Sequence, residues 1–189
     1  DLASRGFKVA LLDRAGRIKP CGGAIPPILI DEFNIPDSQL VAKINTARMV
    51  SPTFREVDIP IENGFVGMVD REHFDEFLRD RASQKGAIRL TGTFQKIDRN
   101  GRLPKVYYKD KLSGKIETIL GRLVIGADGA RSSVARAEIP KGTEIPYVIA
   151  YHEIITAPES TAESHYDPKR CDVIYNGKIS PDFYGWVFP

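Results

Sequence analysis

The stretch Leu123-Val124-Ile125-Gly126-Ala127-Asp128-Gly129 decides the fold class of this 189-residue chain. Three apolar residues typical of a buried strand run directly into a Gly-x-Asp-Gly turn, and Ser132 can cap a helix that follows through Ala137. Glycines let a backbone approach a ligand, and a helix N-terminus favours a pyrophosphate, while the Asp128 carboxylate can accept hydrogen bonds from a polyol. An ordinary Asp-Gly turn capped by Ser132 explains the same residues equally well.

A second apolar run, Phe7 to Leu12, follows a helix end closed by Gly6 and leads into Asp13. Such a run predicts a buried parallel strand. In a dinucleotide-binding βαβ unit, a carboxylate at this place binds the adenosine ribose about 20 residues after a glycine-rich loop, which here would lie upstream of Asp1. A solvated aspartate at a strand–loop junction is the alternative, and for Asp13 taken alone it is the favoured one.

A helix is predicted between these two runs. Asp70 can cap it, apolar residues recur at helical spacing from Arg71 to Lys85, and Gly86 can close it. Arg71 lies in the first turn, where the helix dipole disfavours a cation unless an anion such as a phosphate is bound there. A surface ion pair with Asp75, four residues on, is the alternative.

Strand signals surround that helix. The segments 88–97, 106–108 and 116–120 predict an antiparallel meander, with tight turns at Asn100-Gly101 and at 112–114. Residues 14–66 are expected to be irregular, apart from a short helix near 28–33. Further strands are expected at 147–155, 172–175 and 183–188. These patterns predict a nucleotide-type α/β region over residues 1–143 and a β-rich region over residues 144–189.

Composition excludes several classes of protein. Lys and Arg number 27 against 25 Asp and Glu, so no strong basic field is available for nucleic acid. No stretch approaches the ~20 apolar residues of a membrane span. Cys21 and Cys171 are too far apart in sequence for a disulfide framework or zinc cluster, and the three histidines show no metal-ligand spacing. The chain starts without Met and stops within an aromatic run, so we expect an internal fragment.

Two further motifs point to a flat, apolar ligand. Tyr184, Trp186 and Phe188 alternate, so in a strand they share one face and form an apolar wall that suits a polyprenyl chain. Ordinary sheet core is the alternative. In Cys21-Gly22-Gly23, the glycines favour a backbone packed against a flat ligand, whereas Cys21 can also be a free cysteine that only fills space.

Together these motifs resemble the FAD-dependent oxidoreductases of the p-hydroxybenzoate hydroxylase type. The wording of 19–26, 64–69 and 180–189 is similar to the geranylgeranyl reductases of chlorophyll and bacteriochlorophyll synthesis, closest to those of purple photosynthetic bacteria. The resemblance implies an α/β, Rossmann-type FAD-binding domain with an inserted antiparallel meander over 1–143, lacking its first strand and G-x-G-x-x-G loop. It implies the start of a β-rich prenyl-binding domain over 144–189.

The resemblance also implies roles for individual residues. Asp128 would contact the flavin ribityl chain, Phe94 would lie beside the adenine, and Cys21 would lie near the isoalloxazine as a candidate proton donor. The full set of FAD contacts it implies is Asp13, Arg14, Cys21, Gly22, Gly23, Ala24, Arg71, Phe94 and Asp128. Substrate contacts would come from Tyr184, Trp186 and Phe188, and no metal is expected.

The implied activity is hydrogenation of a geranylgeranyl tail to phytyl, with NADPH as reductant. The substrate would be geranylgeranyl-bacteriochlorophyll or geranylgeranyl diphosphate. The protein would be cytoplasmic, attached peripherally to photosynthetic membrane and in contact with bacteriochlorophyll synthase. Alternatives are an aromatic monooxygenase of the same fold, a non-catalytic prenyl- or pigment-binding protein, and an archaeal-type reductase of ether lipids.

Overall fold

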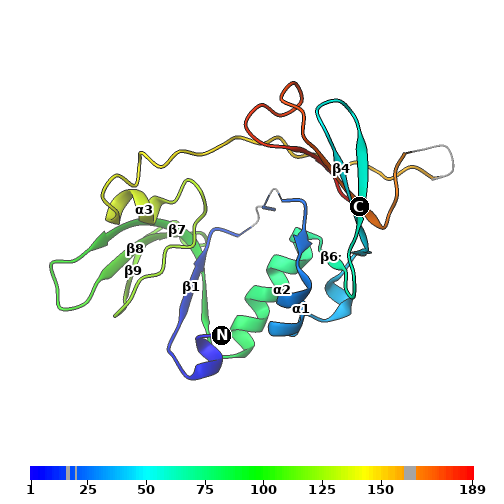
Figure 1. The fold of residues 1–189 in the computed structure, drawn as a ribbon. Helices are drawn as coiled ribbons and strands as arrows, with labels where there is room; N and C mark the ends of the chain where they lie inside the picture. The colour runs from blue at the N-terminus through cyan, green and yellow to red at the C-terminus, as the bar shows by residue number, and fades with distance from the viewer. Residues whose placement is uncertain (16–17, 20, 160–164) are drawn as a thin grey trace. The chain divides into compact units, whose positions relative to one another are not determined.

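The computed structural model describes residues 1–15, 18–19, 21–159 and 165–189, and the chain forms two compact units. The first unit comprises Asp1–Arg17 and Phe77–Tyr147, and the second comprises Ile18–Glu76 and Val148–Pro189. The division between them falls inside helix α2 (Arg71–Gln84). Figure 1 labels several helices and strands of each unit.

The first unit is built on a four-stranded sheet of order β1-β7-β8-β9. Strand β1 (Ala10–Asp13) is parallel to β7 (Ile88–Asp98), and β8 (Lys105–Asp110) and β9 (Ile116–Leu120) follow in an antiparallel meander. A short 3₁₀ helix, Ala3–Arg5, precedes β1, and helix α3 (Ser133–Glu138) follows the meander. The predicted parallel strand, meander and following helix are confirmed, but β1 is not buried, since Ala10 is exposed and Leu11 to Asp13 are half-buried.

Helix α2 begins and ends where the sequence predicts. The Asp70 carbonyl accepts the Phe74 N–H at 2.8 Å, and its carboxylate accepts the Glu72 N–H at 2.9 Å. The first of these is the first regular bond of the helix, and the second satisfies a donor that a helix start otherwise leaves unpaired. The carboxylate bonds from the Glu72 N–H and His73 lower the pKa of Asp70. Beyond the last turn, Gly86 takes the left-handed conformation (φ 96°) that stops a helix.

The second unit holds two sheets. One has the order β11-β10-β4-β5, in which β4 (Thr46–Val50) is parallel to β10 (Arg170–Ile174) and antiparallel to β5 (Glu56–Pro60). Strand β11 (Gly185–Val187) completes it. The other sheet has the order β2-β6-β3, formed by Ala24–Ile25, Val66–Met68 and Ala42–Ile44. Helix α1 (Pro27–Glu32) and a 3₁₀ helix, Asp37–Gln39, lie between these strands in sequence.

Three secondary-structure expectations are wrong. Residues 14–66 are not irregular, because they hold the four strands β2 to β5 as well as α1. The segments 123–125 and 147–155 are not strands, and the Leu123 and Ile125 side chains are 77% and 64% exposed. A strand needs a hydrogen-bonded neighbour, and in the described part of the chain nothing pairs with either segment.

The two units also divide the chain differently from the contiguous regions 1–143 and 144–189. The chain enters the second unit at Val148, close to the predicted boundary, but that unit also includes the excursion Ile18–Glu76. The excursion belongs there because β4 pairs with β10 across a long stretch of sequence. No local composition shift marks such pairing.

The sheet β11-β10-β4-β5 has two unlike faces. Ala47, Met49, Cys171, Val173 and Trp186 lie on one face, because alternate residues of a strand point to the same side. The buried cluster of the unit, Ile44, Met68 and Cys171, packs there with Phe188 against it. No helix among the described residues is long and apolar enough to cross a membrane.

Candidate functional site

The structure brings the Cys-Gly-Gly loop and the aromatic strand of the second unit into contact. A Cβ atom added to Gly22 would lie 2.8 Å from Cδ2 of Phe188 and 3.5 Å from Nε1 of Trp186. The Gly22 backbone therefore lies directly against these rings. More than 160 residues separate the two motifs in sequence. Cys21, at the start of the loop, is exposed.

The other side of this loop is attached to the strand that leads into α2. The Val69 N–H donates to the Gly23 carbonyl at 3.0 Å, and Ala24 pairs with Met68 across β2 and β6. Gly23 has a φ of 77°, and a side chain there would collide with the Val69 carbonyl oxygen. Only glycine fits this position without strain.

The aromatic wall, defined here as Tyr184, Trp186 and Phe188, is half-buried, whereas the intervening Val187 is exposed. The Tyr184 and Trp186 ring centroids are 6.1 Å apart in an edge-on arrangement. His152 stacks on Trp186, with centroids 6.2 Å apart and planes inclined by 18°. No local signal in the sequence marks this stacking.

Arg71 begins α2 and forms a bidentate ion pair with Asp75. The Nε–Oδ1 and Nη2–Oδ2 distances are 2.8 and 2.9 Å, and the two side chains are only 18% and 17% exposed. The Arg71–Asp75 ion pair, which was the alternative to phosphate binding by Arg71, is therefore present. It is less exposed than an ordinary surface ion pair. The guanidinium still has N–H groups beyond these two bonds, because arginine carries five donors. Its role toward a phosphate stays a prediction.

Asp13 and Phe94 lie toward the same end of the β1–β7 pair in the first unit. Asp13 stands opposite Thr91 in the parallel register, and Phe94 is three residues further along β7, roughly 10 Å. The Asp13 carboxylate accepts the Ala15 N–H at 2.7 Å and Nη2 of Arg79 at 3.3 Å. Ligands of α/β sheets bind at this carboxyl end of parallel strands.

Asp128 closes the turn before α3. Its carboxylate accepts a hydrogen bond from Oγ of Ser132 and the N–H groups of Ser133 and Val134, the latter two at 2.6 and 3.2 Å. Desolvation raises the pKa of Asp128, but these hydrogen bonds outweigh it and the net pKa is lowered. Ser132 caps the helix by accepting the Ala135 N–H at 2.9 Å. Asp128 therefore stays ionised at neutral pH.

The residues present fit a flavin dinucleotide. Asp13 combines a partly exposed carboxylate with acceptor capacity beyond its two bonds, as a ribose requires. The turn at Asp128 is open, since a Cβ added to Gly129 would meet no atom within 4 Å. Arg14, next to Asp13, is exposed. The contacts predicted for Asp13, Arg14, Phe94, Asp128, Arg71 and 21–24 remain predictions.

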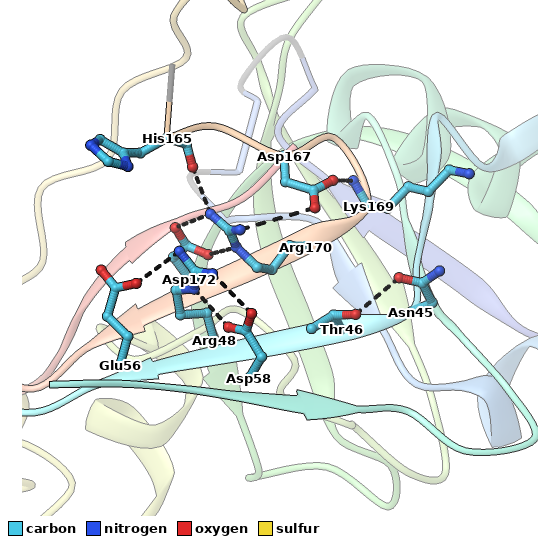
Figure 2. A network of polar contacts seen from close by, with 10 residues as sticks. All are labelled: Asn45, Thr46, Arg48, Glu56, Asp58, His165, Asp167, Lys169, Arg170 and Asp172. Atoms are coloured by element: carbon cyan, nitrogen blue, oxygen red, sulfur yellow. Dashed lines mark hydrogen bonds and ion pairs between the residues drawn. The ribbon is translucent and has the colours of Figure 1, made fainter. Parts of the chain in front are cut away.

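A second group of polar side chains lies on the opposite face of the sheet β11-β10-β4-β5 (Figure 2). Arg48 binds Asp58 at 2.6 and 2.8 Å and Glu56 at 2.9 Å. Arg170 binds Asp172 at 2.6 Å and the His165 carbonyl at 2.6 Å. Among the described residues, no group of three His, Cys, Asp or Glu side chains is placed to hold a metal ion.

Sequence relatives of the chain are named as reductases of geranylgeranyl compounds. It is 65% identical over its whole length to geranylgeranyl diphosphate reductase of Rhodobacter capsulatus, of which it covers 47%. It is 37% identical to the chloroplastic geranylgeranyl diphosphate reductase of Arabidopsis thaliana, covering 42% of that protein. A digeranylgeranylglycerophospholipid reductase of Methanopyrus kandleri is 27% identical over 99% of the chain, which covers 49% of it. The chain thus spans about half the length of these relatives.

The fold is shared with a solved protein described as geranylgeranyl bacteriochlorophyll reductase-like, from Thermoplasma acidophilum. The TM-score is 0.76 at 22% identity, over 99% of this chain and 48% of that one. A flavoprotein/dehydrogenase from Cytophaga hutchinsonii gives a TM-score of 0.66 at 19% identity, over 100% of this chain and 48% of that one. The predicted α/β flavoprotein fold is confirmed. Residues 38–167 match the model of the FAD binding domain, so the chain belongs to the FAD binding domain family.

Proposed function

We propose that this chain is part of an FAD-dependent geranylgeranyl reductase. The enzyme hydrogenates the geranylgeranyl tail of bacteriochlorophyll or chlorophyll, or of geranylgeranyl diphosphate, to phytyl, and NADPH is the reductant. One observation carries the proposal: the Cys-Gly-Gly loop lies against the aromatic wall in a single unit. The 65% identity to a geranylgeranyl diphosphate reductase supports the same activity.

The aromatic wall supports the proposal of a prenyl substrate, because it offers apolar contact area to a ligand that has no hydrogen-bonding groups. In the sheet register Trp186 stands beside Val173, and Val173 beside Met49, so the apolar surface continues across the strands. A polyprenyl tail has no hydrogen-bonding group, and its recognition depends on such contact area. The wall would hold the tail, and its rings would exclude water from the reacting carbons.

Reduction of an isolated alkene needs a proton as well as a hydride. FAD, when bound and reduced, supplies the hydride. Hydride addition alone would leave an unstabilised carbanion, so protonation must lead or accompany it, with positive charge developing at the more substituted carbon. The ring faces of the aromatic wall would stabilise that charge. The exposed Cys21 thiol is the proposed proton donor, because Gly22 holds its loop against the wall.

Cofactor binding is assigned to two groups of residues. Asp13 would hold the adenosine ribose beside Arg14, Phe94 would contact the adenine, and Asp128 would hold the ribityl chain. In the second unit, Arg71 and the backbone of Gly22, Gly23 and Ala24 would contact the flavin. The carboxylates at Asp13 and Asp128 accept hydrogen bonds, which is the chemistry that sugar hydroxyls require.

The substrate also determines where the enzyme would work. A geranylgeranyl tail partitions into a bilayer, so we propose peripheral attachment to the cytoplasmic side of photosynthetic membrane. The enzyme that attaches the tail to the pigment, bacteriochlorophyll synthase, would be a neighbour there.

The test is incubation of the full-length protein, loaded with FAD, with NADPH and either geranylgeranyl-bacteriochlorophyll or geranylgeranyl diphosphate. Products are weighed by mass spectrometry, with and without air. Stepwise gain of hydrogen pairs in both atmospheres is the expected result. Gain of oxygen only in air would identify a monooxygenase, and an unchanged mass for both substrates with flavin bound would also overturn the proposal. Reduction of an archaeal ether lipid in their place would reassign the substrate.

A further inference from the structure

The Cys-Gly-Gly loop is held from two sides, by an aromatic ring on one side and by backbone atoms on the other. On one side Gly22 lies against the Phe188 ring, where an added Cβ would come within 2.8 Å of Cδ2 and 3.2 Å of Cε2. On the other side Gly23 is bonded to Val69, whose N–H donates to the Gly23 carbonyl at 3.0 Å. Two residues after Val69 comes Arg71, the first residue of α2. The loop therefore connects the aromatic strand to the start of that helix.

Neither neighbour can move away easily. Phe188 packs against the buried cluster of Ile44, Met68 and Cys171, whose side chains are 0%, 1% and 8% exposed. Close-packed interiors resist displacement of a ring, since neighbouring side chains must shift with it. On the other side the contact is with backbone, and Val69 is itself 5% exposed. A methyl group on residue 22 would therefore lift the loop from the wall near Cys21.

We propose that Gly22 is a positioning residue that sets the separation between the Cys21 thiol and the aromatic wall, and thereby the approach of the prenyl double bond to its proton donor. The inference rests on the proposed reductase function. Gly22 has no side chain to react or to bind substrate. Its contribution is the missing methyl group, which lets the loop lie directly on Phe188.

A double-mutant cycle tests this contact. Gly22→Ala is compared with Gly177→Ala, a matched control in the same unit where an added Cβ meets no atom within 4 Å and the backbone is not left-handed. Phe188→Leu is combined with Gly22→Ala, because the smaller side chain makes room for the methyl group. All are made in the full-length, FAD-loaded protein. Hydrogenation rate, KM, FAD content and thermal unfolding midpoint are measured for each.

We expect Gly22→Ala to lower kcat for hydrogenation on the order of 10- to 100-fold, because small displacements of reacting groups carry penalties of that size. Rates are expressed per bound FAD, because the Gly22 backbone is also a proposed flavin contact. Gly177→Ala should remain within about twofold of wild type. In the double variant, the penalty of Gly22→Ala should shrink several-fold relative to its penalty in the wild-type background. The unfolding midpoint should show the same non-additivity.

The failures are distinguishable. If the wild type does not hydrogenate prenyl chains but the midpoints of Gly22→Ala and Phe188→Leu are non-additive, the contact stands and the proposed function fails. If the wild type hydrogenates and Gly22→Ala keeps its kcat within about twofold, the inference fails and the reductase stands. An equal loss for Gly22→Ala in the wild-type and Phe188→Leu backgrounds would also overturn it, because the penalty would not arise at this ring.

Discussion

On the sheet β11-β10-β4-β5, neighbouring residues of one strand serve two different surfaces. Cys171 and Val173 face the apolar side, where Phe188 and Trp186 lie, whereas Arg170 and Asp172 face the ionic side (Figure 2). The apolar side carries the proposed substrate wall. On the ionic side Arg48 of β4 binds Glu56 and Asp58 of β5. Asp172 of β10 stands beside Arg48, and its charge adds to the hydrogen bond of Asp58 in raising the pKa of Arg48. Because side chains of a strand alternate between its two faces, the five residues of β10 contribute both to the side of the proposed substrate wall and to the ionic side.

The two faces use different physics. On the ionic side, bonds to Asp58 raise the pKa of Arg48, and bonds to Asp172 raise that of Arg170, so both remain charged. On the apolar side, burial raises the pKa of Cys171 to about 11, with a smaller contribution from Asp172. One face therefore stabilises charge and the other suppresses it. Substitutions one residue apart should have unlike consequences.

The largest expected contrast is in cysteine reactivity. With a pKa of about 11, roughly one Cys171 thiol in a thousand is ionised at pH 8, and the side chain is buried besides. Cys21 is exposed. Iodoacetamide should therefore modify Cys21 at least about a hundredfold faster than Cys171. Peptide mass spectrometry of the native protein measures this ratio, and both thiols should react in urea. Equal native rates would show that the apolar face is open to water.

Phe188→Ala should cause the largest loss of stability. It empties a ring-sized space beside Ile44, Met68 and Cys171, and such truncations cost about 3 kcal/mol. Val187→Ala, one residue away and exposed, should cost less than about 0.5 kcal/mol. Urea unfolding of the full-length protein compares the two. Similar losses would mean that Phe188 is not packed as described.

Arg170→Ala should come next, at about 2 kcal/mol, because it leaves the Asp172 carboxylate and the His165 carbonyl without their partner. Lys169→Ala, whose side chain is exposed, serves as the control. The same unfolding assay applies. Folded Arg170→Ala should keep the hydrogenation rate of wild type, since Arg170 faces away from the proposed substrate wall. A large fall in that rate would break the separation of the two faces.

The smallest expected effect concerns acid. The bonds from Arg48 hold the pKa of Asp58 below its ordinary value of 3.8. A depressed pKa contributes stability above about pH 4 that is lost as the pH falls through the folded-state value. Asp58→Asn should therefore be slightly less stable than wild type at pH 6, with a smaller difference at pH 3, as measured by urea unfolding. The same difference in stability at pH 6 and at pH 3 would show that ionisation of Asp58 contributes nothing.

Local signals predicted much of this fold. Asp70 and Gly86 marked the ends of α2, and the turns at Asn100-Gly101 and 112–114 marked the meander. These features depend on caps and turns, whose residues are adjacent in sequence. Strand β10 was expected at 172–175, but β4 was not predicted, because it reads Thr-Ala-Arg-Met-Val and its parallel partner β10 lies far along the chain. Predicted strands at 123–125 and 147–155 failed because apolar residues alone do not supply a neighbour.

The candidate site shows the same division. Motif spacing identified the Cys-Gly-Gly loop and the aromatic strand separately, and family resemblance placed both in one enzyme. Their contact through Gly22 and Phe188 is seen only in the structure, because the two segments lie far apart in the sequence of the second unit. The stacking of His152 on Trp186 was missed for the same reason.

The parallel pairing of β4 with β10 has a consequence for biosynthesis. Thr46 stands beside Arg170, so roughly 120 residues must be translated after β4 before its inner edge can be covered. At ribosomal rates of about 5–20 residues per second, that interval is roughly 6 to 25 s. During this interval one face of the β4–β5 hairpin exposes Ala47 and Met49, and the edge of β4 that will pair with β10 has unpaired backbone groups. The nascent chain is most exposed to misassembly over this interval, and a chaperone that binds short apolar strands would find its target here.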